Sequence, residues 1–236
     1  MSGTPGSSSI PPHLARKLRD PVGFADVYWP DFQFYGKQRD AIYSVRDSKE
    51  TYLVSANKMG KDFLAGYVVL SFLLHPQMYF DPGYVADVNR RVRPGTNPLF
   101  VHTRRVVTTS VAERHLTVLW GEIGRYLSTC RFPLSYKAGG PLVVNNMELR
   151  FQFEMESKNP INYAVGMVYD NPDKMSGHHA AYTLFVGDEA SGLDDVCKDR
   201  VDGWAKKYLI FGNPNPTANF FYRSVQAGDL LAQGDS

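Results

Sequence analysis

The sequence has few cysteines, no long apolar run and little net charge, and each shortage excludes a class of protein. Cys130 and Cys197 form neither a CxxC motif nor a paired framework, so they indicate intracellular thiols and not a disulfide or zinc site. The longest apolar run, from Phe63 to Leu74, is shorter than the roughly twenty residues that a membrane helix needs. No signal peptide precedes it. The sequence therefore predicts a soluble intracellular protein.

The formal net charge of +2 is too small to indicate a nucleic-acid-binding protein by itself. Any contact with DNA must then come from local basic clusters, although an ordinary solvated surface explains each of them more simply. The clusters are Arg90-Arg91-Val92-Arg93, Arg104-Arg105 and Lys206-Lys207. With 236 residues, 43% of them hydrophobic, the chain is long enough for one substantial domain with its own core.

Short apolar runs alternate with helical segments along most of the chain. Residues 1–12 are rich in Gly, Ser and Pro and are expected to be disordered, ahead of a single domain over residues 13–236. Runs bounded by turn residues and rich in β-branched and aromatic side chains predict five buried strands of a parallel sheet. These runs are Thr51–Ser55, Pro98–His102, Ile161–Val168, Tyr182–Gly187 and Lys207–Phe211.

Helices and one hairpin complete the predicted fold. An apolar helix begins at Lys61, and apolar residues at three- and four-residue steps predict an amphipathic helix over about 111–128. Alternation over residues 141–153, around Asn145-Asn146, predicts an inserted β-hairpin. Its buried face would carry Met147, Leu149, Phe151 and Phe153. The sum is an α/β fold with a mainly parallel sheet flanked by helices.

A candidate phosphate-binding loop joins the first predicted strand to the helix that begins at Lys61. It comprises Ser55, Ala56, Asn57, Lys58, Met59, Gly60, Lys61 and Asp62. Gly60 would let backbone N–H groups turn toward a phosphate, and Lys61 would bind the β- and γ-phosphates at the positive end of the helix. The match is imperfect, because Ser55 replaces the first glycine and Asp62 replaces the hydroxyl that binds Mg²⁺. An ordinary strand-to-helix turn is the alternative.

Two polar motifs end the last two predicted strands. Asp188 would hold Mg²⁺ through its water shell, and Glu189 would orient and deprotonate the attacking water, unless the pair is a solvated acidic turn. Asn213 follows the next strand, where it could sense the γ-phosphate or simply belong to a Pro/Gly turn. Ligand sites of open parallel sheets lie at the carboxyl ends of the strands. We therefore expect Lys61 and Asp188 to converge there, with strand 207–211 between theirs.

Together these motifs resemble the large subunit of tailed-virus terminases, the motors that package viral DNA. The likeness covers roughly residues 30–225 and is most specific over residues 177–214. It rests on Phe34-Tyr35-Gly36-Lys37-Gln38, Leu119-Trp120-Gly121-Glu122-Ile123, Met175-Ser176-Gly177-His178-His179-Ala180, Asp188-Glu189-Ala190-Ser191-Gly192-Leu193-Asp194-Asp195 and Gly212-Asn213-Pro214. The resemblance implies a P-loop NTPase of the ASCE type.

The resemblance also implies an activity and a set of partners. ATP hydrolysis with Mg²⁺ would drive double-stranded viral DNA into a capsid. Gln38 would contact adenine, and Gly212-Asn213-Pro214 would pass the γ-phosphate signal onward. The implied partners are DNA, the capsid portal, the small terminase subunit and further copies in a ring. The implied location is the host cytoplasm and, transiently, the procapsid, with no membrane.

The sequence departs from the family pattern in three places. Asp62 replaces the hydroxyl, and we weigh it as a second metal ligand against a helix-capping role. Asn57, with Lys58 beside it, stands where many relatives carry an arginine. The chain ends before the acidic cluster that the family's nuclease needs, so no nuclease activity is expected.

Two alternative functions remain possible on the sequence alone, and several arginines are candidates for an arginine finger. A helicase-like translocase would need a second motor-like domain, whereas Ser55 and Asp62 favour a nucleotide-binding scaffold that hydrolyses weakly. Many ring ATPases are completed by an arginine finger. The candidates are Arg104, Arg105, Arg200 and Arg223, the first two placed just beyond a strand end on the catalytic edge of the sheet.

Overall fold

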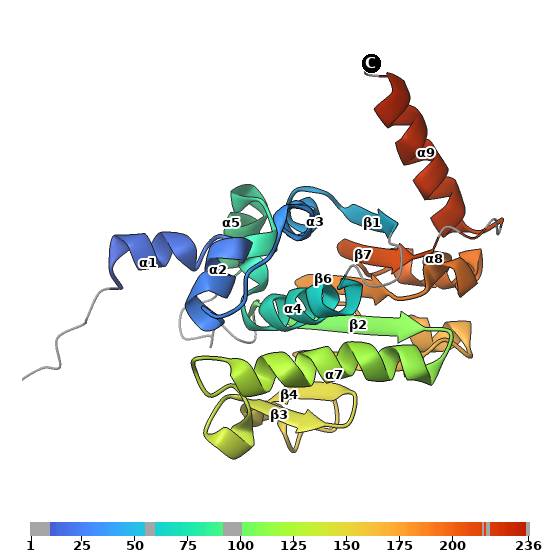
Figure 1. Ribbon diagram of the computed structural model, residues 1–236. Helices are drawn as coiled ribbons and strands as arrows, with labels where there is room; N and C mark the ends of the chain where they lie inside the picture. Colours follow the sequence, from blue (N-terminus) through green and yellow to red (C-terminus); the bar gives the residue numbers. More distant parts are fainter. Residues whose placement is uncertain (1–9, 55–59, 92–100, 214, 216–217, 235–236) are drawn as a thin grey trace, which may run out of the picture.

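A seven-stranded sheet in the order β1-β7-β6-β2-β5-β4-β3 forms the centre of the computed structural model. The structure describes residues 10–54, 60–91, 101–213, 215 and 218–234, and of residues 229–234 only the course of the helix. The strands are β1 (Glu50–Val54), β2 (Arg104–Ser110), β3 (Leu142–Asn145), β4 (Glu148–Phe151), β5 (Tyr163–Val168), β6 (Tyr182–Gly187) and β7 (Lys207–Gly212). The five strands from β1 to β5 in this order are parallel, and β4 and β3 are antiparallel. The arrowheads of β1 and β2 point to one side in Figure 1, which we call the carboxyl edge; the opposite side is the amino edge.

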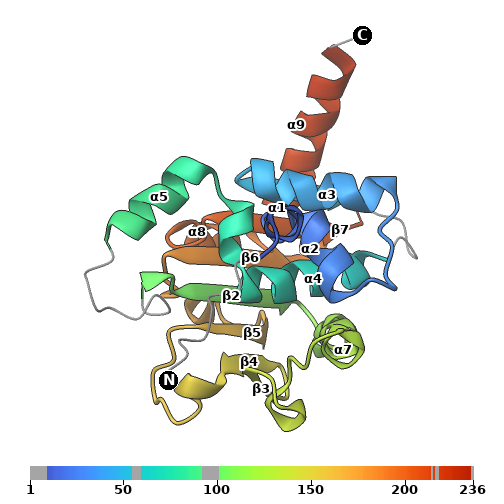
Figure 2. The same ribbon diagram turned by 90° about the vertical axis from the view of Figure 1, so that its left-hand side faces the viewer.

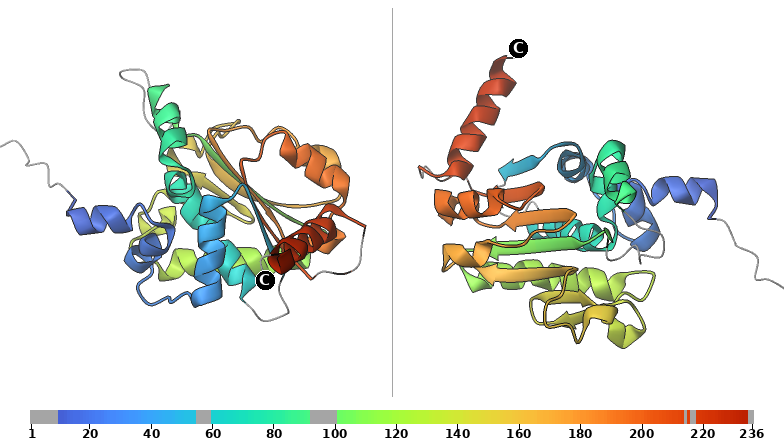
Figure 3. Two further views of the ribbon diagram at one scale, coloured as in Figure 1. Left: turned by 90° about the horizontal axis from the view of Figure 1, so that it is seen from above. Right: turned by 180° about the vertical axis from the view of Figure 1, so that it is seen from behind.

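Helices cover both faces of this sheet. The α-helices are α1 (Pro12–Lys17), α2 (Pro21–Tyr28), α3 (Gly36–Asp47), α4 (Lys61–Leu74), α5 (Pro82–Arg90), α7 (Glu113–Thr129), α8 (Asp195–Asp202) and α9 (Phe220–Gly234). Short 3-10 helices are η1 (Pro76–Tyr79), η2 (Tyr136–Ala138), η3 (Gln152–Glu154), η4 (Pro172–Met175) and η5 (Ala190–Gly192). Helices α3, α4 and α7 pack on one face and α8 on the other, while α9 extends away from the rest (Figures 1 and 3). Within the described residues, none of these helices has the length and apolar character to cross a bilayer.

Side chains of the central strands alternate between two apolar cores. Leu184 and Val186 of β6 lie in the core beneath α4, whereas Phe185 lies in the core beneath α8. In β7, Leu209 lies in the core beneath α4 and Tyr208 in the core beneath α8. Because both faces are buried, such strands appear in the sequence as continuous apolar runs. This explains why the sequence predicts β6 and β7 to within one residue. The partly buried strands β1 and β5 are predicted to within two residues.

The predicted strand Pro98–His102 is wrong, and residues 98–100 lie outside the described part of the chain. The strand in this region is β2, which begins at Arg104 and contains buried polar residues. Its two threonine hydroxyls bond to neighbouring carbonyls: Thr108 Oγ1 donates to Val165 O at 3.3 Å and Thr109 Oγ1 to Met167 O at 2.7 Å. Such bonds allow buried threonines in a central strand, and apolar patterning does not detect a strand of this kind.

The predicted hairpin is confirmed, with two local differences. Its strands are β3 and β4, and the turn lies at residues 146–147, one residue later than predicted. Asn146 has φ of 49°, a left-handed conformation that Asn tolerates better than most residues. Strand β4 ends at Phe151, so Phe153 falls in η3, where its side chain is 47% exposed instead of buried.

Buried Arg104 ties the start of β2 to the end of α4. Its residue exposure is 4%, and its Nη1 donates to the carbonyls of Leu73 and Leu74 at 3.2 and 3.0 Å. Its Nε donates to the His102 carbonyl at 3.1 Å, and its guanidinium lies 5.3 Å from the ring of Phe151. The guanidinium therefore satisfies helix-end carbonyls that would otherwise be buried without a donor.

We predict that Arg104→Ala lowers the free energy of unfolding by about 2–4 kcal/mol, because buried carbonyls lose their donors. Chemical denaturation followed by circular dichroism measures this. Arg91→Ala is the control, since the Arg91 side chain is 73% exposed and pairs with exposed Asp87; its denaturation midpoint should hardly move. Equal stability of both variants would contradict the anchoring role of Arg104.

Candidate active site

Lys61 and Asp188 meet at the carboxyl edge of the sheet, as the sequence predicts. Lys61 is the first residue of α4, which follows β1, and Asp188 follows the last residue of β6. Lys61 Nζ lies 3.3 Å from Asp188 Oδ1 and also donates to Glu189 Oε1. Strand β7 lies between β1 and β6, so the predicted strand order is confirmed.

This cluster holds its charges in a largely buried environment. Asp188 is 1% exposed, and the side chains of Lys61 and Glu189 are 16% and 21% exposed. Burial raises the pKa of Asp188, and the positive charge of Lys61 opposes that shift. Burial alone would lower the pKa of Lys61, but the hydrogen bond to Glu189 and the charge of Asp188 raise it overall. The charges of Lys61 and Asp188 therefore stabilise each other in this buried site.

Glu189 has an unusual backbone conformation. Its φ of 50° and ψ of 49° lie in the left-handed region, which costs a non-glycine residue roughly 1–3 kcal/mol. Such outliers gather at functional sites, where the surrounding structure enforces them. Here the conformation turns the chain directly after β6 and brings a second carboxylate to Lys61.

Asp62 lies in the first turn of α4 beside this cluster. Burial raises the pKa of Asp62 to about 6, with a smaller contribution from the negative charge of Asp188. Carboxylate oxygens of Asp62 and Asp188 are the hard ligands that Mg²⁺ prefers. Among the described residues, no group of three or more His, Cys, Asp or Glu could hold a metal ion. The donor set fits an ion held mainly by phosphates and water, as Mg²⁺ is in nucleotide sites.

Gln38 and Gly60 lie together at the start of α4. Gly60 has φ of 68°, a left-handed conformation that favours glycine, and it precedes the first residue of the helix. A Cβ at Gly60 would lie 3.1 Å from Gln38 Nε2, and Gln38 itself is 6% exposed. A hollow of about 290 Å³ adjoins them, lined in part by Val54 and Lys61. The predicted loop residues Ser55, Ala56, Asn57, Lys58 and Met59 lie outside the described residues.

The end of β7 packs directly against the backbone of the acidic motif. A Cβ at Gly212 would lie 2.9 Å from Ala190 N and 3.4 Å from the carbonyl carbon of Glu189, so only glycine permits this approach. Asn213 follows at once and is half-buried. The structure therefore brings Asn213 to the carboxyl edge between the strands of Lys61 and Asp188.

Asn219 is a site residue that sequence reasoning missed. Its buried Nδ2 donates to the carbonyls of Ala190, Ser191 and Leu193 at 2.9, 3.1 and 2.8 Å. Its Oδ1 accepts from the backbone N–H of Tyr222 at 3.1 Å, which caps the first turn of α9. An Asn ahead of a helix is a typical N-cap, and that signal could have identified it. Asn219 ties the loop after Glu189 to α9.

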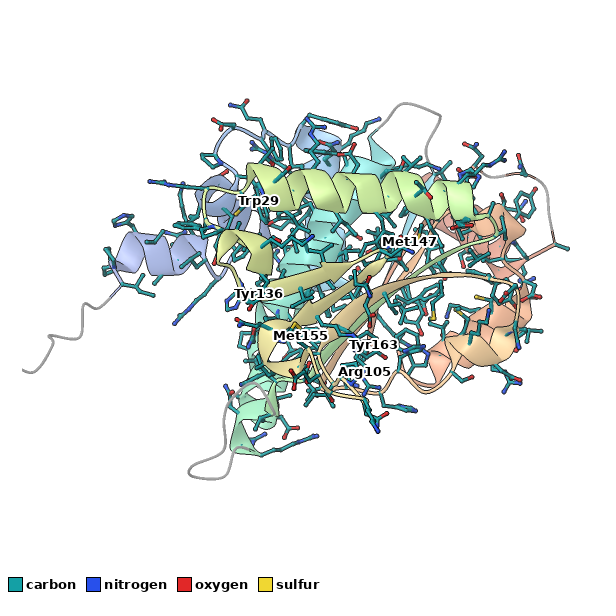
Figure 4. All side chains as sticks on the ribbon, turned by 90° about the horizontal axis from the view of Figure 1, so that it is seen from below. Trp29, Arg105, Tyr136, Met147, Met155 and Tyr163 are labelled. Atoms are coloured by element: carbon teal, nitrogen blue, oxygen red, sulfur yellow. The ribbon has the colours of Figure 1, made fainter. Side chains whose placement is uncertain are left out.

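Arg104 and Arg105 do not lie on the carboxyl edge, contrary to the expectation for an arginine finger. Both begin β2 and therefore lie at the amino edge, opposite Lys61 and Asp188. Arg105 Nη1 donates to Gly177 O at 3.2 Å, and its guanidinium lies 5.2 Å from the Tyr163 ring (Figure 4). The misplacement follows from the wrong strand assignment, because the arginines begin β2 and do not follow a strand.

The remaining candidates for the arginine finger, and the described residues of the basic clusters, have protein partners. Arg200 pairs with Asp173 at 3.3 Å, and Arg223 with Asp195 at 2.8 Å. Arg90 and Arg91 both pair with Asp87, at 3.1 and 2.7 Å. Lys207 Nζ donates to the carbonyls of Arg46 and Ser48, at 2.6 and 2.7 Å, near the end of α3. Much of the clustered positive charge therefore serves the fold.

The α/β fold of this chain is similar to that of phage large terminases in solved structures. The HK97 bacteriophage large terminase matches 92% of this chain with a TM-score of 0.56 and 14% identity, and the chain spans 42% of that protein. The Thermus phage P74-26 large terminase ATPase domain matches 85% of the chain and 71% of its own length, with a TM-score of 0.51 and 14% identity. A mutant of that domain matches 85% of the chain and 72% of its own length, with a TM-score of 0.52 and 12% identity. No family model matches the sequence, and no curated protein matches it significantly.

We predict that, if this site hydrolyses ATP, Gly212→Ala lowers the rate of turnover by about a hundredfold, because a Cβ would displace the Glu189–Ala190 backbone, and misplacement of about 1 Å has that effect. Steady-state phosphate release measures it. Gly203→Ala is the matched control, since a Cβ there would meet nothing nearer than 3.7 Å. Similar turnover in both variants would mean that the contact at Gly212 does not position Glu189.

Proposed function

We propose that this protein is the ATPase motor of a viral DNA-packaging complex of the large-terminase type. The observation that carries the proposal is the convergence of Lys61, Asp188 and Glu189 at the carboxyl edge, with β7 between their strands. Ligands of open parallel sheets bind at that edge. The likeness of the fold to large terminase ATPase domains supports the same function.

Lys61 links nucleotide binding to the catalytic base in this proposal. Its ammonium donates to both Asp188 and Glu189. A bound triphosphate would draw the ammonium to its β- and γ-phosphates, leaving Glu189 free to accept the proton of the attacking water. Asp188 and Asp62 would hold Mg²⁺, which when bound neutralises phosphate charge.

The remaining site residues have supporting roles. Gln38 would contact adenine beside Gly60, and the backbone of residues 55–59 would surround the phosphates. Asn213 would sense the γ-phosphate, and Gly212 would pass the change between β7 and the Glu189–Ala190 backbone. Asn219 extends this connection to α9. The proposed partners are double-stranded DNA, the capsid portal, the small terminase subunit and further copies in a ring, in the host cytoplasm and transiently on the procapsid.

A nucleotide-binding scaffold that hydrolyses weakly is the second candidate function. Its specific support is Asp62, a carboxylate close enough to Asp188 for the two charges to interact. A further negative charge beside the phosphates weakens nucleotide binding unless a cation compensates it. Measured turnover by the wild-type protein separates the two functions.

We predict that Glu189→Gln keeps ATP binding and loses about a hundred- to ten-thousand-fold in turnover, because it removes the base while Asp188 and Lys61 remain. Single-turnover hydrolysis and equilibrium binding of labelled ATP measure the two effects. Glu113→Gln, an exposed residue at the start of α7, is the control. Near-normal hydrolysis by Glu189→Gln would remove this residue from the mechanism, and absent hydrolysis by the wild type would favour the scaffold.

We predict that Asp62→Thr binds ATP about tenfold more tightly than the wild type when Mg²⁺ is absent. At pH 8 Asp62 is ionised, since its pKa is about 6. Two charges 4 Å apart repel by about 4 kcal/mol at an effective dielectric of 20, and solvent and salt reduce this. Saturating Mg²⁺ should narrow the gap, because the ion attracts both the carboxylate and the phosphates. Parallel affinity curves across a Mg²⁺ titration would mean that Asp62 only caps α4.

A further inference from the structure

The hydroxyl of Ser110 is buried without a hydrogen-bond partner among the described residues. Ser110 is the last residue of β2 and is 0% exposed. The preceding threonines of the strand, Thr108 and Thr109, both donate their hydroxyls to carbonyls. Buried polar atoms without partners are rare, because they lose water and gain nothing in return. The other three such atoms in the described part of the chain belong to Gln77, Arg105 and Tyr126, none of which lies at the carboxyl edge.

Strand pairing puts Ser110 beside Asp188. The parallel register pairs Thr109 with Gly187, and Asp188 N–H donates to Thr109 O at 2.9 Å, so Ser110 and Asp188 are the next neighbours (β2 runs beside β6 in Figure 1). Both strands end at the carboxyl edge, which holds Lys61. Figure 2 shows β2 and β6 side by side in the middle of the sheet.

Alternation places the two side chains on the same face of the sheet. In β2, Val106 and Thr108 face the side of α4 and α7, since Val106 lies in that core and Thr108 accepts from Trp120 of α7 at 3.0 Å. Ser110 lies two residues after Thr108 in β2, so its side chain faces the same side of the sheet. In β6, Val186 lies in that core, and Asp188 two residues later contacts Lys61 of α4.

We infer that the Ser110 hydroxyl belongs to the nucleotide site, where it holds a water of the Mg²⁺ shell that Asp188 gathers. This inference rests on the proposed function. It makes Ser110 a positioning residue, acting through water and Asp188. It also accounts for two departures at once. The predicted phosphate loop carries Asp62 where a hydroxyl is usual, and β2 ends in a hydroxyl that has no partner among the described residues. Partners one shell away from a metal ion commonly set its affinity.

Ser110→Ala separates this role from a structural one. A buried hydroxyl without a hydrogen-bond partner destabilises the folded protein, so its removal should raise the melting temperature by about 2–4 °C. If Ser110 holds the metal's water, the same variant should bind Mg²⁺ about tenfold more weakly in its complex with ADP. Calorimetric titration of Mg²⁺ into the ADP complex measures this affinity without turnover. Ser110→Thr keeps the hydroxyl and should retain the affinity.

Tyr126→Phe is the matched control. It removes another buried hydroxyl without a partner among the described residues, in the last turn of α7, and should raise the melting temperature while leaving Mg²⁺ affinity unchanged. Unchanged Mg²⁺ affinity in Ser110→Ala, whatever its melting temperature, would overturn the inference and leave the proposed function standing. A wild-type protein that binds no nucleotide would overturn both.

Discussion

The ammonium of Lys61 keeps two adjacent carboxylates together in a site that is largely closed to water. Without it, Asp188 and Glu189 would repel each other, and the burial of Asp188 would favour its neutral form. The cluster is therefore stable only as a set, and breaking it needs another source of charge compensation. In the proposed function, a nucleotide with its cation would supply such a source, and the site would then respond to nucleotide.

Strand β7 occupies the position through which that response could reach the rest of the domain. It separates β1 from β6, and Gly212 at its end contacts the backbone at Glu189 and Ala190. From the other side, Asn219 holds the same loop through three carbonyls and caps α9. A change in the backbone of Glu189 therefore has two packed neighbours to displace. Close-packed interiors have low compressibility and transmit strain, so such a displacement would pass to both neighbours.

Prediction from the sequence succeeded where burial produces a continuous local pattern and failed where polar groups are satisfied by distant partners. Strands β6 and β7 are apolar on both faces, and their boundaries follow from composition alone. Strand β2 is polar at its start and its end, so it escaped detection, and Arg104 was assigned to the wrong edge of the sheet. Only the carbonyls at the end of α4 explain why an arginine can begin a buried strand.

By itself the sequence determined the α/β class, the strands β1, β5, β6 and β7, the helix at Lys61 and the motifs that end in Asp188 and Asn213, since each is encoded in contiguous residues. The tertiary structure alone decided which side chains share an edge: that Ser110 lies beside Asp188, that Asn219 holds the acidic loop, and that Arg105 lies far from both. The reason is physical. Local patterns report burial and backbone preference, whereas a buried polar group is defined by its partner, and strand order brings that partner from elsewhere in the chain.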